Sequence, residues 1–389
     1  MFDYVIVGAG LSGAVVAERI ANDLNKSVLI VEKRSHIAGN VFDHYDENGL
    51  LVHKYGPHIF HTKLEEVWDY VSQFTEWHYY QHRVLGSVDG HLVPIPFNLA
   101  SILALMPDHL AKQLEEKLVR QFGLNVKVPI LRLRETEDDQ LKWLADFVYE
   151  KVFLNYTRKQ WKMNPEELDP YVTGRVPVYI SFDDRYFQDP YQGVPKRGYT
   201  AIVEAMLKHK NIKVMLNTDF ADIIRRDDRD GSFTLFGQPY SGKLIYTGKI
   251  DELFQYEFGE LPYRSLRFQF ETVMREQYQK TGTVNYPNEY GFTRITEFKH
   301  LTGQSHPHTS IVREYPQEYD RNDSDKDIPY YPIPQQQNQE MYKLYRQKAK
   351  KYRNLLLLGR LAEYTYYDMD ACIAKALKTY KQDIIGDLR

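Results

Sequence analysis

The first 32 residues constrain the fold more than any other part of the chain. Residues 4–7, "YVIV", are apolar and rich in β-branched side chains, as is typical of a buried parallel strand. Gly8, Gly10 and Gly13 follow with the spacing G-x-G-x-x-G, and apolar residues then recur at helical spacing. This order predicts a strand, a tight turn and a helix whose N-terminus faces the pyrophosphate of a dinucleotide.

A second apolar segment, "SVLIVEK", supports the same interpretation. It ends in Glu32, whose carboxylate can accept hydrogen bonds from a ribose hydroxyl. A glycine-rich turn without a ligand is the alternative, and the order of strand, helix, strand and acidic residue disfavours it. The motif by itself does not separate NAD from FAD. Its place at the N-terminus and the Gly-, Asn- and His-rich segment after Glu32 favour FAD.

Composition excludes several classes of function. The formal charge of −3 gives no basic field that would attract nucleic acid. Cys372 is the one cysteine, so an intrachain disulfide is excluded and a reducing compartment is favoured. We see no signal peptide before the first strand and no apolar run of membrane length. We therefore expect a soluble cytoplasmic protein without nucleic-acid or membrane partners. The 31 tyrosines suit a site for bases and sugars.

The length of 389 residues suggests two or three domains. The last strand, in "NLLLLGR", and the last helix, in "MDACIAKALKTYKQDI", lie far from the first strand–turn–helix unit. We therefore expect an α/β protein with a split Rossmann-like FAD-binding domain, formed by residues 1–80, 191–242 and 340–389. Helical periodicity predicts an inserted helical domain at 98–165. Residues 81–97, 166–190 and 243–339 are expected to form an antiparallel-sheet substrate domain.

Six separated motifs carry a resemblance to a known family. They are "YGPHIFHT" (55–62), "FLNYTRKQWKMNPEEL" (153–168), "TGRVPV" (173–178), "NYPNEYGFTRITEFKH" (285–300), "PYYPI" (329–333) and "LGRLAEYTYYDMD" (358–370). In this order, over essentially the whole chain, they resemble the prokaryotic UDP-galactopyranose mutases. The resemblance implies an isomerase that interconverts UDP-galactopyranose and UDP-galactofuranose. It also implies a homodimer and FAD that is active when reduced, with NADPH or NADH as the reductant.

The mechanism that the resemblance implies uses the cofactor as nucleophile. N5 of reduced FAD attacks the anomeric carbon, and UDP is the leaving group. The sequence shows no carboxylate pair of the kind that glycosyl transfer usually employs, in keeping with this mechanism. Arginines suit the diphosphate because they are permanently charged and bind phosphate oxygens in pairs. Catalytic roles are implied for Arg175, Arg294 and His61.

The remaining site residues are also implied by the resemblance. For the substrate, with the uridine site in the helical domain, they are Phe153, Tyr156, Thr157, Trp161, Arg175, Tyr186, Arg264, Asn285, Arg294, Tyr331 and Tyr366. Tyr330 competes with Tyr331, because the double tyrosine leaves the register open. For the cofactor they are Gly8, Gly10, Leu11, Ser12, Gly13, Glu32, Lys33, Asn40, His58, His61, Arg360, Asp368 and Met369.

Three other interpretations are weighed against this one. His58 and His61 could suggest a metal site, but no third ligand has useful spacing, so we expect no metal. An FAD-dependent oxidoreductase of the amine-oxidase type would share the N-terminal motif and the split domain. It would not need Arg175 and Arg294, which favour an anionic substrate. A non-catalytic nucleotide-binding protein is opposed by the intact motifs. The tolerance for 2-acetamido and other UDP-sugars stays open.

Overall fold

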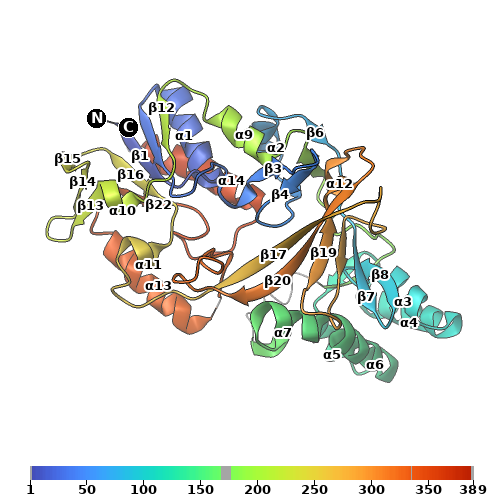
Figure 1. The fold of residues 1–389 in the computed structure, drawn as a ribbon. Helices are drawn as coiled ribbons and strands as arrows, with labels where there is room; N and C mark the ends of the chain where they lie inside the picture. Colours follow the sequence, from blue (N-terminus) through green and yellow to red (C-terminus); the bar gives the residue numbers. More distant parts are fainter. Residues whose placement is uncertain (1, 168–176, 334, 387–389) are drawn as a thin grey trace.

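The computed structural model describes residues 2–167, 177–333 and 335–386 (Figure 1). A parallel sheet of five strands, in the order β12-β2-β1-β16-β22, lies at its centre. These strands span Tyr4–Val7 (β1), Val28–Val31 (β2), Ile212–Met215 (β12), Lys243–Tyr246 (β16) and Leu355–Leu357 (β22). The predicted nucleotide-binding sheet is confirmed, and its strands come from distant parts of the chain.

Both faces of this sheet are covered, which explains the unbroken apolar character of its strands. Side chains of one parity, such as Ile6 and Ile30, pack under α1, α9 and α14. Side chains of the other parity, such as Val5 and Leu29, pack under α11, α13 and a small antiparallel sheet, β13-β14-β15. These elements span Leu11–Leu24 (α1), Tyr199–Met206 (α9), Met369–Thr379 (α14), Ile250–Leu253 (α11), Gln336–Ala349 (α13), Ile224–Asp227 (β13), Ser232–Leu235 (β14) and Gln238–Tyr240 (β15).

Strand β16 corrects one predicted domain boundary. We expected residues from 243 onward in the substrate domain, but Lys243–Tyr246 pairs in parallel with β1, from Tyr4↔Lys243 to Val7↔Tyr246. The strand is buried in the middle of the nucleotide-binding sheet, so that unit extends beyond residue 242. The segment after it, Thr247–Lys249, consequently lies beside the glycine motif.

A second, larger sheet has seven strands in the order β21-β17-β20-β19-β18-β7-β8. Long strands β17 and β20 cross the middle of the molecule (Figure 1). Its pairs are antiparallel except for β18 and β7, which are parallel. The strands span Val84–Val88 (β7), His91–Ile95 (β8), Tyr263–Val273 (β17), Thr283–Asn285 (β18), Arg294–Glu297 (β19), Thr309–Glu318 (β20) and Tyr331–Pro332 (β21).

A group of helices packs against the β7–β8 hairpin. Their shared apolar core also contains Val84, Val88 and Ile95 of that hairpin, so it is continuous across the boundary that we predicted at residue 98. A π-helical segment, Tyr149–Leu154, joins α6 to α7 without a break. The helices span Leu99–Leu105 (α3), Asp108–Phe122 (α4), Ile130–Arg134 (α5), Asp139–Val148 (α6) and Asn155–Trp161 (α7).

The other described elements connect these layers. They are β3 (Asp43–Tyr45), β4 (Leu51–His53), β5 (Phe60–Thr62), α2 (Glu65–Ser72), β6 (Trp77–His78), β9 (Val126–Val128), β10 (Val178–Ile180), β11 (Tyr191–Pro195), α10 (Phe220–Ile223), α12 (Phe298–Thr302), the 3-10 turns Gly39–Val41 and Pro165–Glu167, and the π-helical segment Tyr380–Ile384. Among the residues that the structure describes, every helix is too short or too polar to cross a bilayer.

Candidate functional site

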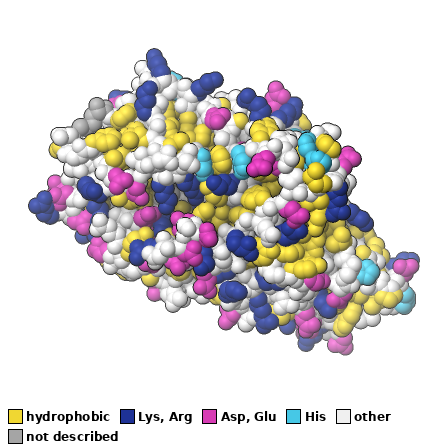
Figure 2. All heavy atoms as spheres, in the orientation of Figure 1, with side chains coloured by type: hydrophobic (Ala, Val, Ile, Leu, Met, Phe, Trp, Pro, Cys, Tyr) yellow, Lys and Arg dark blue, Asp and Glu magenta, His cyan; other side chains and the backbone are white. Residues whose placement is uncertain are grey.

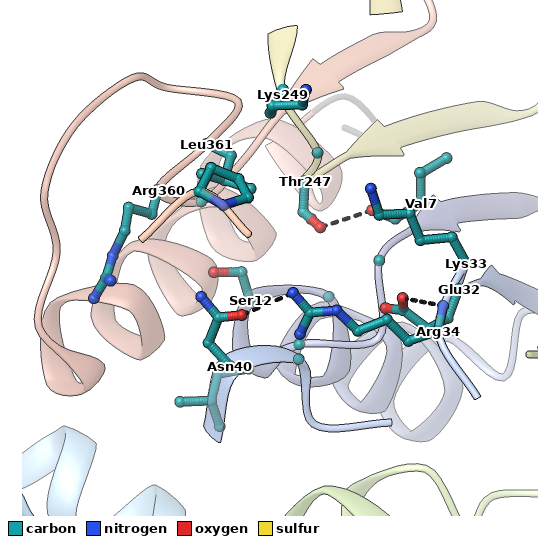
Figure 3. Close-up of a pocket in the computed structure, with 18 of the residues that line it drawn as sticks. Val7, Ser12, Glu32, Lys33, Arg34, Asn40, Thr247, Lys249, Arg360 and Leu361 are labelled. Carbon is teal, nitrogen blue, oxygen red and sulfur yellow. Dashed lines mark hydrogen bonds between the residues drawn. The ribbon is translucent and has the colours of Figure 1, made fainter. Parts of the chain in front are cut away.

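A cavity of about 530 Å³ lies at the carboxyl ends of the parallel strands (Figure 3). Val7, Val31 and Tyr246, the last residues of β1, β2 and β16, line it. Strand β1 pairs in parallel with β2 on one side and with β16 on the other. The order in which strands are added to the sheet therefore reverses at β1. In open α/β sheets, ligands bind at such a switch point.

The three glycines of the motif have different structural tasks. Gly8 has φ +103°, and a Cβ there would lie 2.1 Å from Oγ1 of Thr247. A Cβ on Gly13 would lie 2.2 Å from the Gly8 carbonyl oxygen. Gly10 has an ordinary φ of −78°, and a Cβ there would meet only the Cα of Gly39, at 3.8 Å. The space beside Gly10 is therefore open to a ligand at the N-terminus of α1, where free N–H groups favour an anion.

Glu32 is held in place before any ligand binds. Its carboxylate accepts hydrogen bonds from the main-chain N–H of Ala9 and of Arg34, both at 2.9 Å, and the residue is 7% exposed. Each carboxylate oxygen retains a lone pair that can accept a ribose hydroxyl. The carboxylate is thus oriented along one wall of the cavity (Figure 3).

Arg34 is a cavity residue that the sequence analysis missed. Its Nη2 donates to Oδ1 of Asn40 at 3.0 Å, and its guanidinium lies 4.6 Å from the ring centre of Tyr55. Its buried Nη1 has no hydrogen-bond partner among the described residues. A buried N–H group without an acceptor is costly, so this atom fits a ligand oxygen. The signal in the sequence was a basic residue two positions after Glu32.

The predicted cofactor residues line this cavity, except for His61 and Asp368. His61 instead forms a 2.5 Å hydrogen bond through Nδ1 to Asp189, and its ring stacks on Phe187 with 3.6 Å between centroids. Asp368 is the N-cap residue of α14 and accepts a 3.0 Å hydrogen bond from the Tyr366 hydroxyl, beside the lining residue Met369.

His58 occupies the cavity wall as a neutral imidazole. Burial lowers its pKa to about 3, with the nearby His53, Arg360 and Arg294 acting in the same direction. Its Nδ1 is buried and has no partner among the described residues. At neutral pH the ring carries no charge. It can therefore form a hydrogen bond with a ligand, but it cannot act as a general acid in the way that a protonated imidazolium can.

Two further loops contribute lining residues that we did not predict. Thr218, Asp219 and Phe220 follow β12, and Thr247, Gly248 and Lys249 follow β16. Each loop follows a parallel strand, so the rule that ligands bind at strand ends could have indicated them. Cys372 also lines the cavity, and burial raises the pKa of its thiol to about 11. The thiol is therefore protonated at neutral pH and is a poor nucleophile.

The donor set fits a dinucleotide. It combines an open anion position at the α1 N-terminus, an oriented carboxylate for a ribose and a buried guanidinium N–H without an acceptor. In the described part of the chain, no three His, Cys, Asp or Glu side chains are arranged to hold a metal ion.

Arg294 lies in the large sheet, directly opposite Glu314 on the neighbouring strand β20. The two side chains form a bidentate pair, with Nε–Oε2 at 3.0 Å and Nη2–Oε1 at 2.8 Å. Burial opposes the charge of Arg294, but Glu314 outweighs it, and the pKa of the guanidinium lies well above its ordinary value. Glu314 is 1% exposed and occupies one edge of the fork, which leaves Nη1 free of Glu314 for a ligand.

Arg360 in the cavity lies beside two of the predicted substrate tyrosines. Tyr331 and Tyr366 stack with 5.6 Å between ring centroids and an interplanar angle of 24°. Trp161 lies 6.1 Å from Tyr331, and the Arg360 guanidinium lies 4.7 Å from the centre of the Tyr366 ring. Arg360 also donates to the main-chain oxygens of Tyr330 and Tyr367. The tyrosine pair therefore adjoins the cavity at Arg360.

The two adjacent tyrosines, Tyr330 and Tyr331, lie in different surroundings. Tyr330 is 3% exposed and packs with Tyr55 and Leu266, whereas Tyr331 points to Trp161 and Tyr366. Tyr331 is the first residue of β21, and Tyr330 directly before it is the more buried of the two. The geometry favours Tyr331.

Replacing Tyr331 with phenylalanine is expected to lower turnover about tenfold, because one hydrogen bond to the ligand is lost. Tyr330→Phe is the matched control and is expected to retain turnover within about twofold. Steady-state rates of the two purified variants check this. Equal losses in both variants would refute the assignment of Tyr331.

Tyr156 lies close to the Arg294 pair, and Tyr186 lies close to Tyr156. Burial raises the pKa of Tyr156 to about 12, and Arg294 lowers it while Glu314 and Tyr186 raise it. The Tyr186 ring contacts Phe187 and His82, at 4.9 and 5.7 Å between centroids. Both tyrosines are half-buried and thus reachable from the site.

The other predicted substrate residues are placed less uniformly. Phe153 is 8% exposed and belongs to the core of the helices, whereas Thr157 and Trp161 are half-buried on α7. Arg264 is 3% exposed, and its Nε donates to the main-chain oxygen of Gln160 at 2.9 Å. This hydrogen bond attaches Arg264 to the C-terminal end of α7.

Two predicted substrate residues remain. Asn285 pairs with Arg294 across β18 and β19, and its buried Oδ1 has no partner among the described residues. Arg175 lies outside the described residues.

On the face shown in Figure 2, Lys and Arg side chains gather near the middle of the molecule, although the formal charge of the chain is −3.

Comparison with known proteins identifies the family. A family model described as UDP-galactopyranose mutase matches residues 151–366. The chain is 38% identical to the UDP-galactopyranose mutase of Mycoplasma genitalium, over 98% of this chain and 94% of that protein. The chain belongs to the UDP-galactopyranose mutase family. The resemblance found in the sequence motifs is thereby confirmed, and so is the prediction of an isomerase. The chain is also 34% identical to the dTDP-fucopyranose mutase of Escherichia coli, over 96% of each chain.

The fold comparisons agree with this family. A model described as an NAD(P)-binding Rossmann-like domain matches residues 6–74. The crystal structure of a reduced UDP-galactopyranose mutase is similar with a TM-score of 0.72, at 17% identity, covering 99% of this chain and 94% of that one. Putrescine oxidase bound to putrescine gives a TM-score of 0.59 at 12% identity, covering 99% of both chains. The amine-oxidase alternative is therefore a likeness of fold alone.

Proposed function

We propose that this mutase interconverts UDP-galactopyranose and UDP-galactofuranose, with a reduced FAD bound in the cavity. One observation carries the proposal: Arg360 lines the dinucleotide cavity and lies over Tyr366, which stacks on Tyr331 within the electrostatic reach of Arg294. A guanidinium beside aromatic rings suits a nucleoside diphosphate joined to a sugar.

The residues that would hold FAD are those of the cavity. The α1 N-terminus beside Gly10 would bind the pyrophosphate, Glu32 a ribose, and Arg34 a further ligand oxygen. When bound and reduced, the flavin would supply the electron pair for the displacement of UDP from the anomeric carbon. His58 and Arg360 line the cavity beside the tyrosines, where the protein can exclude water from the reacting carbon.

Arg294 would hold the departing diphosphate. Its charge is permanent, so it neutralises phosphate oxygens without transferring a proton. Glu314 already balances one positive charge, so a diphosphate needs a further cation. Arg175 would supply it by resemblance, and Arg360 adds a second guanidinium near Tyr366.

The tyrosines would act as neutral donors. Burial raises the pKa of both Tyr331 and Tyr156, so their hydroxyls keep their protons at neutral pH. A neutral phenol donates a hydrogen bond to a phosphate or sugar oxygen without adding negative charge beside the diphosphate. Together with Trp161 and Thr157 they would orient the nucleotide.

A direct comparison of substrates tests the proposed function. Dithionite-reduced protein is given UDP-galactofuranose or dTDP-fucofuranose at equal concentration, and chromatography follows the pyranose products. We expect kcat/KM to be at least about tenfold higher for the UDP-sugar, because one differing contact in a binding pocket typically gives discrimination of this size. A preference for the dTDP-sugar would overturn the proposed substrate while leaving the family intact.

The remaining partners are part of the same proposal. We propose NADPH or NADH as reductant, a homodimer and a cytoplasmic location. Anaerobic bleaching of the bound flavin by each nicotinamide would identify the reductant, and equal inactivity of both would refute it.

A further inference from the structure

Lys159 connects the helix that carries predicted nucleoside residues to the loop that directly precedes Arg294. It lies on α7, and its Nζ donates to the main-chain oxygens of Tyr286 and Glu289, at 2.8 and 2.7 Å. Those acceptors belong to the loop 286–293 between β18 and β19. One ammonium therefore fixes α7 against this loop.

The same loop ends at two predicted site residues. Asn285 is the last residue of β18 and Arg294 the first of β19, and the two pair directly across the strands. A shift of the loop would therefore move the base of the Arg294 side chain. The motif "YTRKQW" places Lys159 three residues after Tyr156 and two before Trp161. A shift of α7 would move both of these.

Additional hydrogen bonds join the two segments. Asn155 Nδ2 donates to Asn288 Oδ1 at 3.0 Å, and Asn288 Nδ2 donates to the Lys151 main-chain oxygen at 2.8 Å. Asn288 is exposed, whereas Lys159 is half-buried, and burial lowers the pKa of the Lys159 ammonium while Glu289 opposes this. Charge-assisted bonds in a partly desolvated place are the stronger ones, so Lys159 contributes most to this contact.

A second cation fixes the end of the same helix. The buried Arg264, on β17, donates through Nε to the main-chain oxygen of Gln160, one of the last carbonyls of α7. Helix α7 has only seven residues, so its position depends on tertiary contacts. Adjacent residues 159 and 160 thus attach α7 at two points, to the loop 286–293 and to strand β17.

We propose that Lys159 is a positioning residue, which sets the separation between the nucleoside contacts on α7 and the diphosphate contact at Arg294. The proposal rests on the proposed function, because it requires a ligand that spans both. A ligand held at two points gains affinity when their separation is preset, and it loses that gain when the points move independently. A ligand that touches only α7 has no such gain to lose.

Two probes distinguish positioning from simple support of the helix. UDP spans both contacts, whereas uridine reaches only the nucleoside part. In Lys159→Met, which keeps the side-chain length without charge, we expect UDP affinity to fall about tenfold and uridine affinity to stay within about twofold. Titration calorimetry of the flavin-containing protein measures both. Lys159→Arg keeps donors and is expected to recover part of the UDP affinity.

The matched control is Arg158→Met. Arg158 is exposed on the same helix, and its Nε donates to Asn164 rather than to the loop 286–293. We expect wild-type affinity for both probes in this control. Flavin absorbance and thermal unfolding show whether each variant is folded.

Every outcome bears on one of the two proposals. Equal losses for UDP and uridine in Lys159→Met would mean that the lysine only supports the helix, and unchanged UDP affinity would mean that the contact is unimportant; either overturns the positioning role. Wild-type protein that binds no UDP would instead refute the proposed function.

Discussion

Replacing Arg294 with methionine is expected to lower turnover about a thousandfold, the loss typical when a group that stabilises developing charge is removed. The leaving diphosphate gains negative charge as the sugar–oxygen bond breaks. Arg294 is aimed at the site by its bidentate pair with Glu314, so its charge is in place before the reaction. Steady-state assays of the reduced protein measure the loss, and turnover within about tenfold of wild type would contradict this role.

A second effect of this substitution needs its own control. Methionine leaves the carboxylate of Glu314 buried without its cation, which is expected to lower the free energy of unfolding by about 3 kcal/mol. The double variant Arg294→Met/Glu314→Gln removes the buried charge as well. We expect it to regain most of the stability but none of the turnover. Recovery of turnover in the double variant would show that the single variant failed through its fold.

Replacing Gly10 with threonine is expected to abolish flavin binding while leaving the fold intact. Gly10 has an ordinary φ, a Cβ there meets no side chain, and threonine is an acceptable N-cap residue. The free energy of unfolding of the apo-protein is therefore expected to stay within about 1 kcal/mol of the wild-type value. The new side chain would fill the space where the pyrophosphate is expected. Flavin absorbance per chain should fall more than tenfold, and occupancy equal to wild type would contradict the assignment.

Gly8→Ala provides the contrast for this second prediction. Its φ of +103° and the 2.1 Å approach to Oγ1 of Thr247 make any side chain there a strain on the folded chain itself. We expect this substitution to lower the free energy of unfolding of the apo-protein by about 2 kcal/mol or more. Thermal unfolding without flavin compares the two variants, and equal stability of both would refute the separate roles of these glycines.

The nucleotide-binding part could be predicted because its signals are local. Apolar runs, the glycine spacing and Glu32 all lie within one strand–helix–strand unit, and the structure places them at one sheet edge. Residues 243–246 are expected in the substrate domain but form a strand of the nucleotide-binding sheet. Its partner β1 lies more than two hundred residues earlier, and pairing over such a separation leaves no local pattern.

The missing parts of the site depend on non-local packing. Glu314 and Lys159 were not predicted as site residues. Glu314 matters because β19 pairs with β20, and Lys159 because it bonds α7 to the loop 286–293. Tyr330 and Tyr331 are identical in chemistry, so only strand geometry could separate them. His61 was expected at the cofactor, but the structure pairs it with Asp189, a partner that the sequence did not suggest.

The most direct test of the account follows one reaction in two redox states. The purified flavin-containing protein is incubated with UDP-galactofuranose, with and without dithionite, and the sugar nucleotides are separated by chromatography. We expect conversion to UDP-galactopyranose only in the reduced state, because the proposed nucleophile is present only there. Equal conversion in both states, or none in either with flavin still bound, would contradict it.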